Sequence, residues 1–463
     1  MNVYLTILIV YSLALMALGL SIGRRVRGTA DFFVAGRRLG PGLIFATMLA
    51  ANIGAGSTVG ATALGYTNGI SAAWWVGSAG LGSLVLAFWI GPSMRRVAEA
   101  HDLRTVGDYL EHRYSAAVRT LAAAILWVGS LFILAGQLWA IGSIISAVTG
   151  APPWIGCAIG GVVITVYFSA GGLLTAAWVN VVQLAVKMIG FAVALRWAVH
   201  AAGGLAGTPP GLPADYLTLW RAGSPGLSTL AILVPPFVVS PGLLQKIFGA
   251  RDDAAVRVGV GLNALGLLLF AAVPAVLGIL ARAFFPDLPS ADLALPTLLV
   301  RAVPPAVGAI GLAAVFSAEV SASDAILFML TTSLSQDFYR RFINPTAGDR
   351  QVLRLARWTA VCGGAAGTAL AIVLGSVVNA LTIFYTLVGV SLFVPILAGL
   401  YVRRTSAAGA LLTMIAGVAA AVTVHVLTGG RGFGLFSPAV AGLAAAIGVW
   451  VITLFVSKTH PRP

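Results

Sequence analysis

The stretch AANIGAGSTVG, from Ala50 to Gly60, interrupts a run of apolar residues with an amide, two hydroxyl residues and three glycines. A second interruption, FVVSPGLLQK from Phe237 to Lys246, places a Ser-Pro-Gly sequence inside another apolar run. Glycine and proline weaken helix interiors, and irregular backbone at membrane depth is tolerated where it lines a cavity. The two stretches therefore predict broken helices around a binding site near the bilayer midplane.

The composition is that of a polytopic membrane protein. Of the 463 residues, 59% are hydrophobic and only 9% are charged, with a mean hydropathy of +0.97, which excludes the soluble classes. A helix needs about 20 apolar residues to cross the hydrocarbon core. We predict thirteen such spans, at residues 2–22, 41–66, 70–94, 115–149, 152–170, 174–199, 227–248, 254–283, 297–335, 352–378, 380–402, 406–428 and 435–457. The first is expected to be a retained helix, because it lacks the basic start and small-residue cleavage site of a signal peptide.

The positions of the basic residues predict the orientation. With the N-terminus outside, 22 of the 28 Lys and Arg residues fall on one side of the membrane and five on the other, and Lys187 lies within a span. Basic residues concentrate in cytoplasmic loops. We therefore expect a multi-pass protein of the cytoplasmic (inner) membrane, with its N-terminus outside and its C-terminus inside.

No linker or change in composition divides the chain, so a single transmembrane domain over residues 1–463 is expected. If the first helix is set aside, the two interrupted helices open two successive groups of five helices. This division gives an extra N-terminal helix and inner loop at 1–40, a first repeat at 41–199, a second repeat at 227–403 and C-terminal helices at 404–463.

Six motifs in order resemble the sodium/solute symporter family, whose members carry sugars, proline, sialic acid, pantothenate, monocarboxylates and other small solutes. They are DFFVAGRRLG at Asp31, TVGDYLEHRY at Thr105, YFSAGGLLTAAWVNVVQ at Tyr167, SPGLLQK at Ser240, SLSQDFYRRF ending at Phe342, and FVPILAGLYVRRTSAAGAL at Phe393. The resemblance implies an all-α integral membrane fold. Its 5+5 inverted-repeat core carries one extra N-terminal and two extra C-terminal helices, and it acts as a secondary active transporter by alternating access.

The resemblance also implies a sodium site shared by the first and eighth core helices. The matching positions are the carbonyls of Ala50, Ile53 and Ala318 and the side chains of Ser321 and Ala322. Family members place Ser or Thr where this chain has Ala322, so one ligand is missing. They also usually place Asp at the position of Asn180, whereas Asp324 stands where some relatives offer a hydroxyl to an additional inner sodium site.

Lys187 is the third departure from the family pattern. It lies seven residues beyond Asn180, on nearly the same helix face and roughly 10 Å further along the axis. About 12 residues separate it from either end of its predicted span, too many for its ammonium to reach an interface. We hypothesise that Asp324 faces Lys187 and that the ammonium occupies the place of the sodium ion, as in transporters of the same overall fold with a lysine on the corresponding fifth helix.

Three coupling modes remain open at this point. A lysine whose surroundings change during transport favours a proton-coupled symporter working through Lys187 and Asp324. The alternative is a sodium-coupled symporter with an altered sodium site, and the third is a static ion pair in an uncoupled or exchange carrier. The expected partners are therefore H⁺ or Na⁺, the lipid bilayer and a small organic solute.

Family positions that form the substrate wall correspond here to Asn52, Gly56, Ser57, Trp74, Gln137, Pro236, Phe237 and Ser240. Few of these side chains are strong hydrogen-bond formers, so a carboxylate, an amino acid or a flat heterocycle is a better substrate than a sugar. Trp74 has an alternative place in an interfacial aromatic belt. For Glu319, a role in the pocket or in a proton relay competes with a structural, hydrogen-bonded one.

Other function classes lack their motifs. The histidines have no metal-ligand spacing, and no nucleotide-binding pattern is present. The chain also lacks the paired nucleophile and base of an enzyme, so no catalytic residue, organic cofactor, metal beyond a possible Na⁺, or nucleic acid partner is expected. A transporter-like sensor would need a soluble signalling domain, which the sequence does not contain.

Overall fold

The structure is a computed structural model that describes residues 3–23, 37, 39–204, 212–221, 226–344, 346–434 and 436–456. Its regular elements are all helical, and isolated bridges at Leu39–Ala250 and Phe433–Phe436 are the β-type pairings within these ranges. The DFFVAGRRLG motif lies largely outside the described residues.

The helices of the first half of the chain begin with α1, which precedes the broken helix formed by α3 and η2. They are α1 (Val3–Gly23), α3 (Pro41–Asn52), η2 (Gly56–Gly60), α4 (Ala61–Asn68), η3 (Gly69–Ala72), α5 (Ala73–Val85), η4 (Leu86–Ile90), α6 (Gly91–Ala100), α7 (Val106–Arg113), α8 (Ala116–Thr149), α9 (Pro153–Ala201) and η5 (Ala214–Leu217). The remaining helices are α10 (Gly226–Val239), α11 (Pro241–Phe248), α12 (Asp253–Phe270), α13 (Ala272–Phe284), η6 (Ala291–Leu293), α14 (Ala294–Arg301), α15 (Pro305–Thr332), η7 (Ser333–Ile343), α16 (Asp349–Leu374), α17 (Val377–Tyr401), α18 (Ala407–Thr428) and α19 (Pro438–Val456).

Ten helical stretches are long and apolar enough to cross a membrane, and three shorter apolar helices lie at Val3–Leu15, Pro41–Asn52 and Pro153–Thr165. Two predicted boundaries are corrected. The expected interruption between residues 170 and 174 does not appear, because α9 continues through it. The expected span at 297–335 is divided, because Pro304 and Pro305 end the short α14 and start α15.

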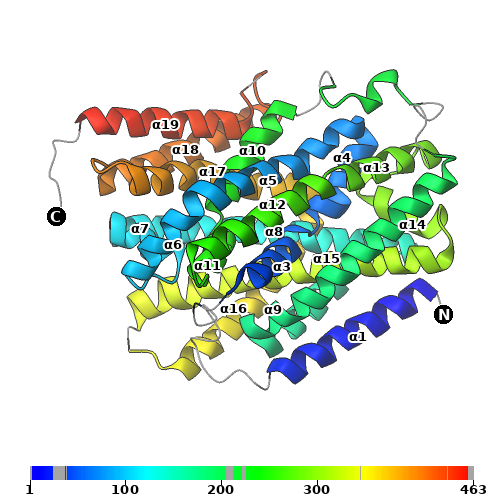
Figure 1. Ribbon diagram of the computed structural model, residues 1–463, viewed down its shortest axis with the longest axis horizontal. Helices are drawn as coiled ribbons and strands as arrows, with labels where there is room; N and C mark the ends of the chain where they lie inside the picture. The colour runs from blue at the N-terminus through cyan, green and yellow to red at the C-terminus, as the bar shows by residue number, and fades with distance from the viewer. Residues whose placement is uncertain are drawn as a thin grey trace.

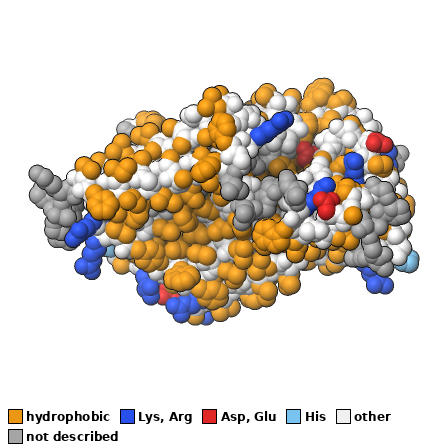
Figure 2. Space-filling model, turned by 90° about the horizontal axis from the view of Figure 1, so that it is seen from above, with side chains coloured by type: hydrophobic (Ala, Val, Ile, Leu, Met, Phe, Trp, Pro, Cys, Tyr) orange, Lys and Arg blue, Asp and Glu red, His pale blue; other side chains and the backbone are white. Residues whose placement is uncertain are grey.

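The long helices lie side by side along the long axis of the molecule, with α6 and α7 at one end and α14 at the other (Figure 1). Helix α15 is central and packs against α9, α8, α16 and α1. Hydrophobic side chains cover a broad continuous band of the face in Figure 2, with charged side chains in small groups around it. A surface of this kind suits a lipid environment.

Both predicted helix breaks are confirmed. Helix α3 ends at Asn52 and helical structure resumes at Gly56, while α10 ends at Val239 and α11 begins at Pro241. The first break packs closely against its neighbours, because a Cβ added at Gly54 would meet the Cβ of Ala322 on α15. The irregular backbone is therefore enclosed by protein.

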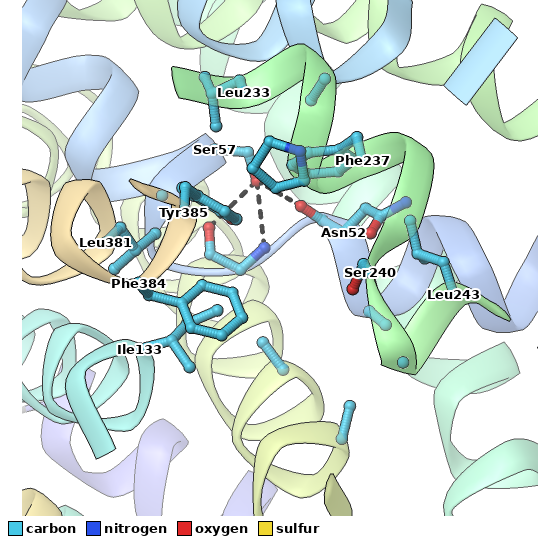
Figure 3. Close-up of a pocket in the computed structure, with 18 of the residues that line it drawn as sticks. Asn52, Ser57, Ile133, Leu233, Phe237, Ser240, Leu243, Leu381, Phe384 and Tyr385 are labelled. Atoms are coloured by element: carbon cyan, nitrogen blue, oxygen red, sulfur yellow. Dashed lines mark hydrogen bonds between the residues drawn. The ribbon is translucent and has the colours of Figure 1, made fainter. Parts of the chain in front are cut away.

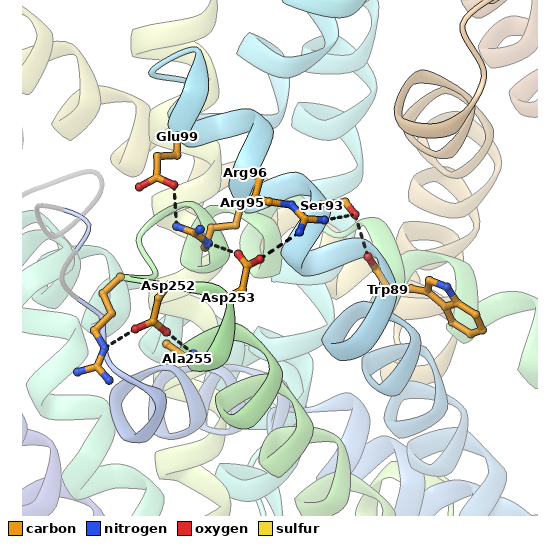
Figure 4. A network of polar contacts seen from close by, with 9 residues as sticks. Trp89, Ser93, Arg95, Arg96, Glu99, Asp252, Asp253 and Ala255 are labelled. Carbon is orange, nitrogen blue, oxygen red and sulfur yellow. Dashed lines mark hydrogen bonds and ion pairs between the residues drawn. The ribbon is translucent and has the colours of Figure 1, made fainter.

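A polar network joins the ends of α6 and α12 at the face that is rich in basic residues (Figure 4). Arg95 and Arg96 both bind the carboxylate of Asp253, at 2.5 Å and 3.3 Å. The neighbouring Asp252 accepts a 2.6 Å hydrogen bond from the Ala255 amide as the cap of α12, and this bond lowers the Asp252 pKa. Helix α12 is therefore fixed at this end by charge and by capping.

The segments that precede α3 and follow α11 are also joined. The Leu39 amide donates to Gly249 O at 3.0 Å, and the Arg251 amide donates to Leu39 O at 3.1 Å. Helices α3 and α11, each of which is one half of a broken helix, are thus linked by backbone hydrogen bonds at their outer ends.

Close packing of α13 on α4 makes Gly278 a sensitive position. A Cβ at Gly278 would collide with the backbone of Thr62 and Tyr66, whereas a Cβ at Gly77 on α5 would meet its nearest neighbour, the Ala271 Cβ, at 4.0 Å. We expect Gly278→Ala to destabilise the protein by about 1–3 kcal/mol or more, and Gly77→Ala to be neutral or stabilising by up to about 1 kcal/mol. Thermal unfolding of the two variants in detergent measures this difference, and equal melting temperatures would contradict it.

Asp292 joins η6 to α8 and α17 outside the spans. Its Oδ2 accepts hydrogen bonds from Trp139 Nε1 at 3.1 Å and from the Val377 amide at 3.2 Å. Burial raises the Asp292 pKa from 3.8 to about 6 and outweighs these two bonds, which lower it. Because the folded state favours the protonated acid, this group makes the protein more stable as pH falls from about 6 towards 4.

Asp292→Asn keeps an oxygen acceptor for both donors and removes the buried charge. We expect this variant to be more stable than the parent protein at pH 7 by at most about 3 kcal/mol. The difference should shrink to near zero at about pH 4. Parallel melting curves across this range measure it, and a difference that does not depend on pH would contradict the assignment.

Candidate functional site

Lys187 on α9 is fully buried, and its ammonium contacts three oxygens. Nζ lies 2.6 Å from Ala50 O, 3.1 Å from Ile53 O and 2.5 Å from Ser321 Oγ. Ser321 Oγ also lies 2.9 Å from Ala50 O, so its hydroxyl can donate to that carbonyl while Nζ donates to Oγ. In this arrangement Nζ donates to three acceptors, as a lysine does in its ammonium form.

The two carbonyls come from the C-terminal end of α3, just before the break. A helix leaves its last carbonyls without intrahelical partners and carries partial negative charge at this end. The ammonium satisfies two of these carbonyls and also binds α15 through Ser321. One charged group therefore links α3, α9 and α15.

The predicted partner Asp324 lies near Lys187. Asp324 is 2% exposed, and it and Glu319 both interact electrostatically with the ammonium. The hydrogen bonds described for Nζ go to Ala50, Ile53 and Ser321.

The other predicted cation residues lie on α9 and α15, the helices of Lys187 and Ser321. Ala318 is fully buried on α15, and the carbonyl of Ala318 is not among the acceptors of Nζ that the structure describes. Ala322 faces Gly54 and lines the neighbouring cavity. Asn180 is 7% exposed, and its Oδ1 has no hydrogen-bond partner within the described part of the chain.

Glu319 on α15 contacts η2, the helical segment that follows the first break. Its Oε1 lies 2.8 Å from Thr58 Oγ1, which also contacts Gly54 O at 3.0 Å. The side chain is fully buried and does not line the cavity, so its predicted place in the substrate pocket is corrected. Helix α15 therefore holds the end of α3 through Ser321 and the start of η2 through Glu319.

A cavity of about 100 Å³ lies beside the two breaks (Figure 3). It includes seven of the residues predicted for the substrate wall: Asn52, Gly56, Ser57, Gln137, Pro236, Phe237 and Ser240. Trp74 is not among them, which corrects its predicted role. It packs against Trp220 at 4.6 Å between ring centroids and donates to Leu219 O, whereas the adjacent Trp75 points to the cavity.

Most polar groups of the cavity already have partners. Ser57 Oγ bonds to the backbone of Asn52 and Gly54 across the break, and Gln137 Oε1 accepts from the Ala55 amide at 2.8 Å. The Asn52 amide group donates to Asn263 at 3.0 Å. These side chains stabilise the broken backbone and leave few groups for a polyhydroxylated ligand.

Sequence reasoning missed Phe384 and Tyr385 in the aromatic wall, and a second lysine. Tyr385 on α17 contacts Trp75, Phe237 and Phe384, with ring centroids 6.4, 5.6 and 5.3 Å away. Lys246 also lines the cavity, and it was not among the residues predicted for the site. The signal available for Lys246 was its place at the end of the interrupted stretch FVVSPGLLQK.

Comparison with known proteins places the chain among cation-coupled carriers. The profile of the sodium:solute symporter family matches residues 32–210 and 213–417. The sodium/glucose cotransporter of Vibrio parahaemolyticus is 24% identical, over 88% of this chain and 82% of the relative. The sodium/pantothenate symporter of Escherichia coli K12 is 27% identical over 84% and 82%, and the human high affinity choline transporter 1 is 24% identical over 90% and 76%.

The fold agrees with this assignment. A Na⁺-coupled sialic acid symporter, solved in a substrate-bound outward-open state, superposes with a TM-score of 0.81 at 18% identity, over 98% of both chains. Mhp1, a nucleobase-cation-symport-1 family transporter, superposes with a TM-score of 0.63 at 15% identity, over 92% of this chain and 95% of Mhp1. Both are transporters with the inverted-repeat fold. From the profile match over most of its length and this shared fold, the chain belongs to the sodium:solute symporter family.

Proposed function

We propose that this protein is a proton-coupled symporter in which the Lys187 ammonium takes the place of a coupling sodium ion. The observation that carries the proposal is the contact of Nζ with Ala50 O, Ile53 O and Ser321 Oγ. These are oxygens that the family pattern assigns to sodium. An ammonium at 2.5–3.1 Å from all three leaves no space for a metal ion among them.

The protonation state of Lys187 is linked to the position of α3. The protonated lysine holds the end of α3 against α9 and α15. A neutral amine has two protons and a lone pair, so it cannot donate to all three oxygens. Either the Ser321 hydroxyl turns from Ala50 O to donate to Nζ, or a carbonyl loses its partner. Protonation therefore favours the conformation in which α3 is fixed, and proton release favours its movement.

The sodium-coupled alternative also has support. The relatives include proteins named as sodium cotransporters, and the oxygens of Ala50, Ile53 and Ser321 are suitable ligands for Na⁺ once Nζ moves away. In that case Lys187 would be a competitor of the ion. The two modes differ in whether sodium stabilises the protein.

The solute that suits the cavity is small, organic and not a sugar. Several polar side chains around the cavity are bonded to the broken backbone, and an aromatic wall forms one side. The relatives are named for glucose, pantothenate and choline, among other solutes. A compact solute with few hydroxyl groups fits the described lining better than a polyol.

Thermal stability in matched sodium and potassium salts tests the coupling ion without a known solute. A ligand that binds the folded state at 100 times its Kd stabilises it by about 2.7 kcal/mol. Proton coupling predicts equal melting temperatures in the two salts, and a pH dependence of stability that differs between the parent protein and Lys187→Met. A sodium-specific increase would favour the alternative instead.

A further inference from the structure

Lys246 is the only charged residue among the described residues that line the cavity. It lies in the last turn of α11, the half-helix that begins at Pro241 after the second break. The lining also contains the aromatic side chains of Trp75, Phe384 and Tyr385, and Phe384 and Tyr385 lie across from Leu243 of α11 in Figure 3. The cavity therefore combines an aromatic lining with one charged group.

The ammonium of Lys246 has donors to spare. It contacts Thr47 O at 2.8 Å, which uses one of its three protons. No ion pair between described residues joins Lys246 to a carboxylate. A cation held inside a membrane bundle requires a compensating partner, and the cavity beside it has space for one.

Other charges make the site favourable for an anion. Lys187 and Lys246 both bind carbonyls of α3, at Ala50 and Thr47, one helical turn apart, and their charges interact. The N-terminus of α11 also faces the cavity through Gly242 and Leu243, and a helix N-terminus carries partial positive charge. An anion in the cavity would reduce the repulsion between the two lysines.

We propose that the transported solute is an organic monoanion, a small carboxylate with an apolar or aromatic body, and that Lys246 determines this specificity. The carboxylate binds the free donors of Lys246, and the body lies against Phe237, Phe384 and Tyr385. This inference rests on the proposed function in taking the cavity as the solute site, but it does not depend on which cation is coupled. Entry of a monoanion with one proton or one sodium ion is electroneutral.

Lys246 also has a structural contact, which the test must separate from anion binding. Its bond to Thr47 O joins α11 to α3, the two half-helices that are linked at Leu39 and Gly249. Lys246→Gln keeps a neutral donor for Thr47 O and removes the charge, whereas Lys246→Arg keeps the charge. A purely structural role predicts that both variants bind solutes as the parent protein does once they are folded.

Thermal-shift titrations of the purified full chain provide the test, at one pH and constant ionic strength. The probes are acetate, butyrate, benzoate and phenylacetate, each paired with its neutral amide. At least one carboxylate should stabilise the parent protein more than its amide does. In Lys246→Gln its apparent Kd should rise roughly 10- to 100-fold, while Lys246→Arg should keep most of the affinity.

Three results would overturn the proposal: no stabilisation by any of the carboxylates, equal stabilisation by the amides, or unchanged carboxylate binding in Lys246→Gln. The melting temperature of each variant without probes reports whether the Thr47 contact alone has been lost. Failure of this test leaves the sodium and pH titration of the parent protein unaffected, because that titration contains no solute. The substrate class and the coupling ion can thus be rejected separately.

Discussion

Lys187→Met is expected to abolish solute-driven proton movement while leaving the protein folded. Methionine fills a similar volume but provides no donor for Ala50 O, Ile53 O or Ser321 Oγ. Loss of the donor leaves buried acceptors unsatisfied, which costs about 1–3 kcal/mol per group, but methionine avoids the further cost of a cavity. Proteoliposomes with an entrapped pH-sensitive dye, exposed to a panel of organic acids, amino acids and heterocycles, measure the proton movement.

Lys187→Ala is the matched comparison, because it removes the same charge but leaves a void. This variant should cost about 2–5 kcal/mol in stability. It should lose proton movement in the same way as Lys187→Met. If Lys187→Met still moves protons with the solute and keeps the pH dependence of the parent protein, Lys187 is not the coupling group.

Local sequence was sufficient to predict the broken helices and the burial of Lys187. The interruptions at Ala50–Gly60 and Phe237–Lys246 contain the residues that weaken a helix, so the breaks occur where those residues lie. The depth of Lys187 within its span required a buried partner, and the free carbonyls at the end of α3 are strong acceptors for an ammonium. These features can be predicted from the sequence of one helix or of one helix end.

The misplaced residues are those whose roles depend on which helices are neighbours. The spacing of Ser321 and Asp324 places them on one face of α15, but it does not tell which atom the Lys187 ammonium reaches first. Trp74 and Trp75 are adjacent and therefore point to different sides, and only the packing of α5 selects Trp75 for the cavity. Lys246 lies near the end of a predicted span, and only the packing of α11 against α3 places it in the cavity lining.

The triple variant Lys187→Met, Asn180→Asp and Ala322→Ser is expected to create a sodium site. Loss of Nζ frees the oxygens of Ala50, Ile53 and Ser321, and the new serine supplies the hydroxyl that the family pattern has at this position. Asn180 Oδ1 lacks a hydrogen-bond partner among the described residues, so a carboxylate at this position has an oxygen available for the cation. The cation then binds oxygen atoms, which hard cations such as Na⁺ prefer.

Melting temperatures in sodium and potassium at equal ionic strength measure the gain. At a sodium concentration of about 100 times the Kd, the triple variant should gain about 2.7 kcal/mol in sodium alone. The control is the double variant Asn180→Asp and Ala322→Ser, in which the Lys187 ammonium still occupies the oxygens and sodium should have no effect. A flat titration of the triple variant would mean that Ala50, Ile53 and Ser321 do not form the latent site, while a sodium response in the double variant would mean that the ammonium does not exclude the ion. Only the combination of a response with methionine and none with lysine identifies the Lys187 ammonium as the resident substitute for sodium.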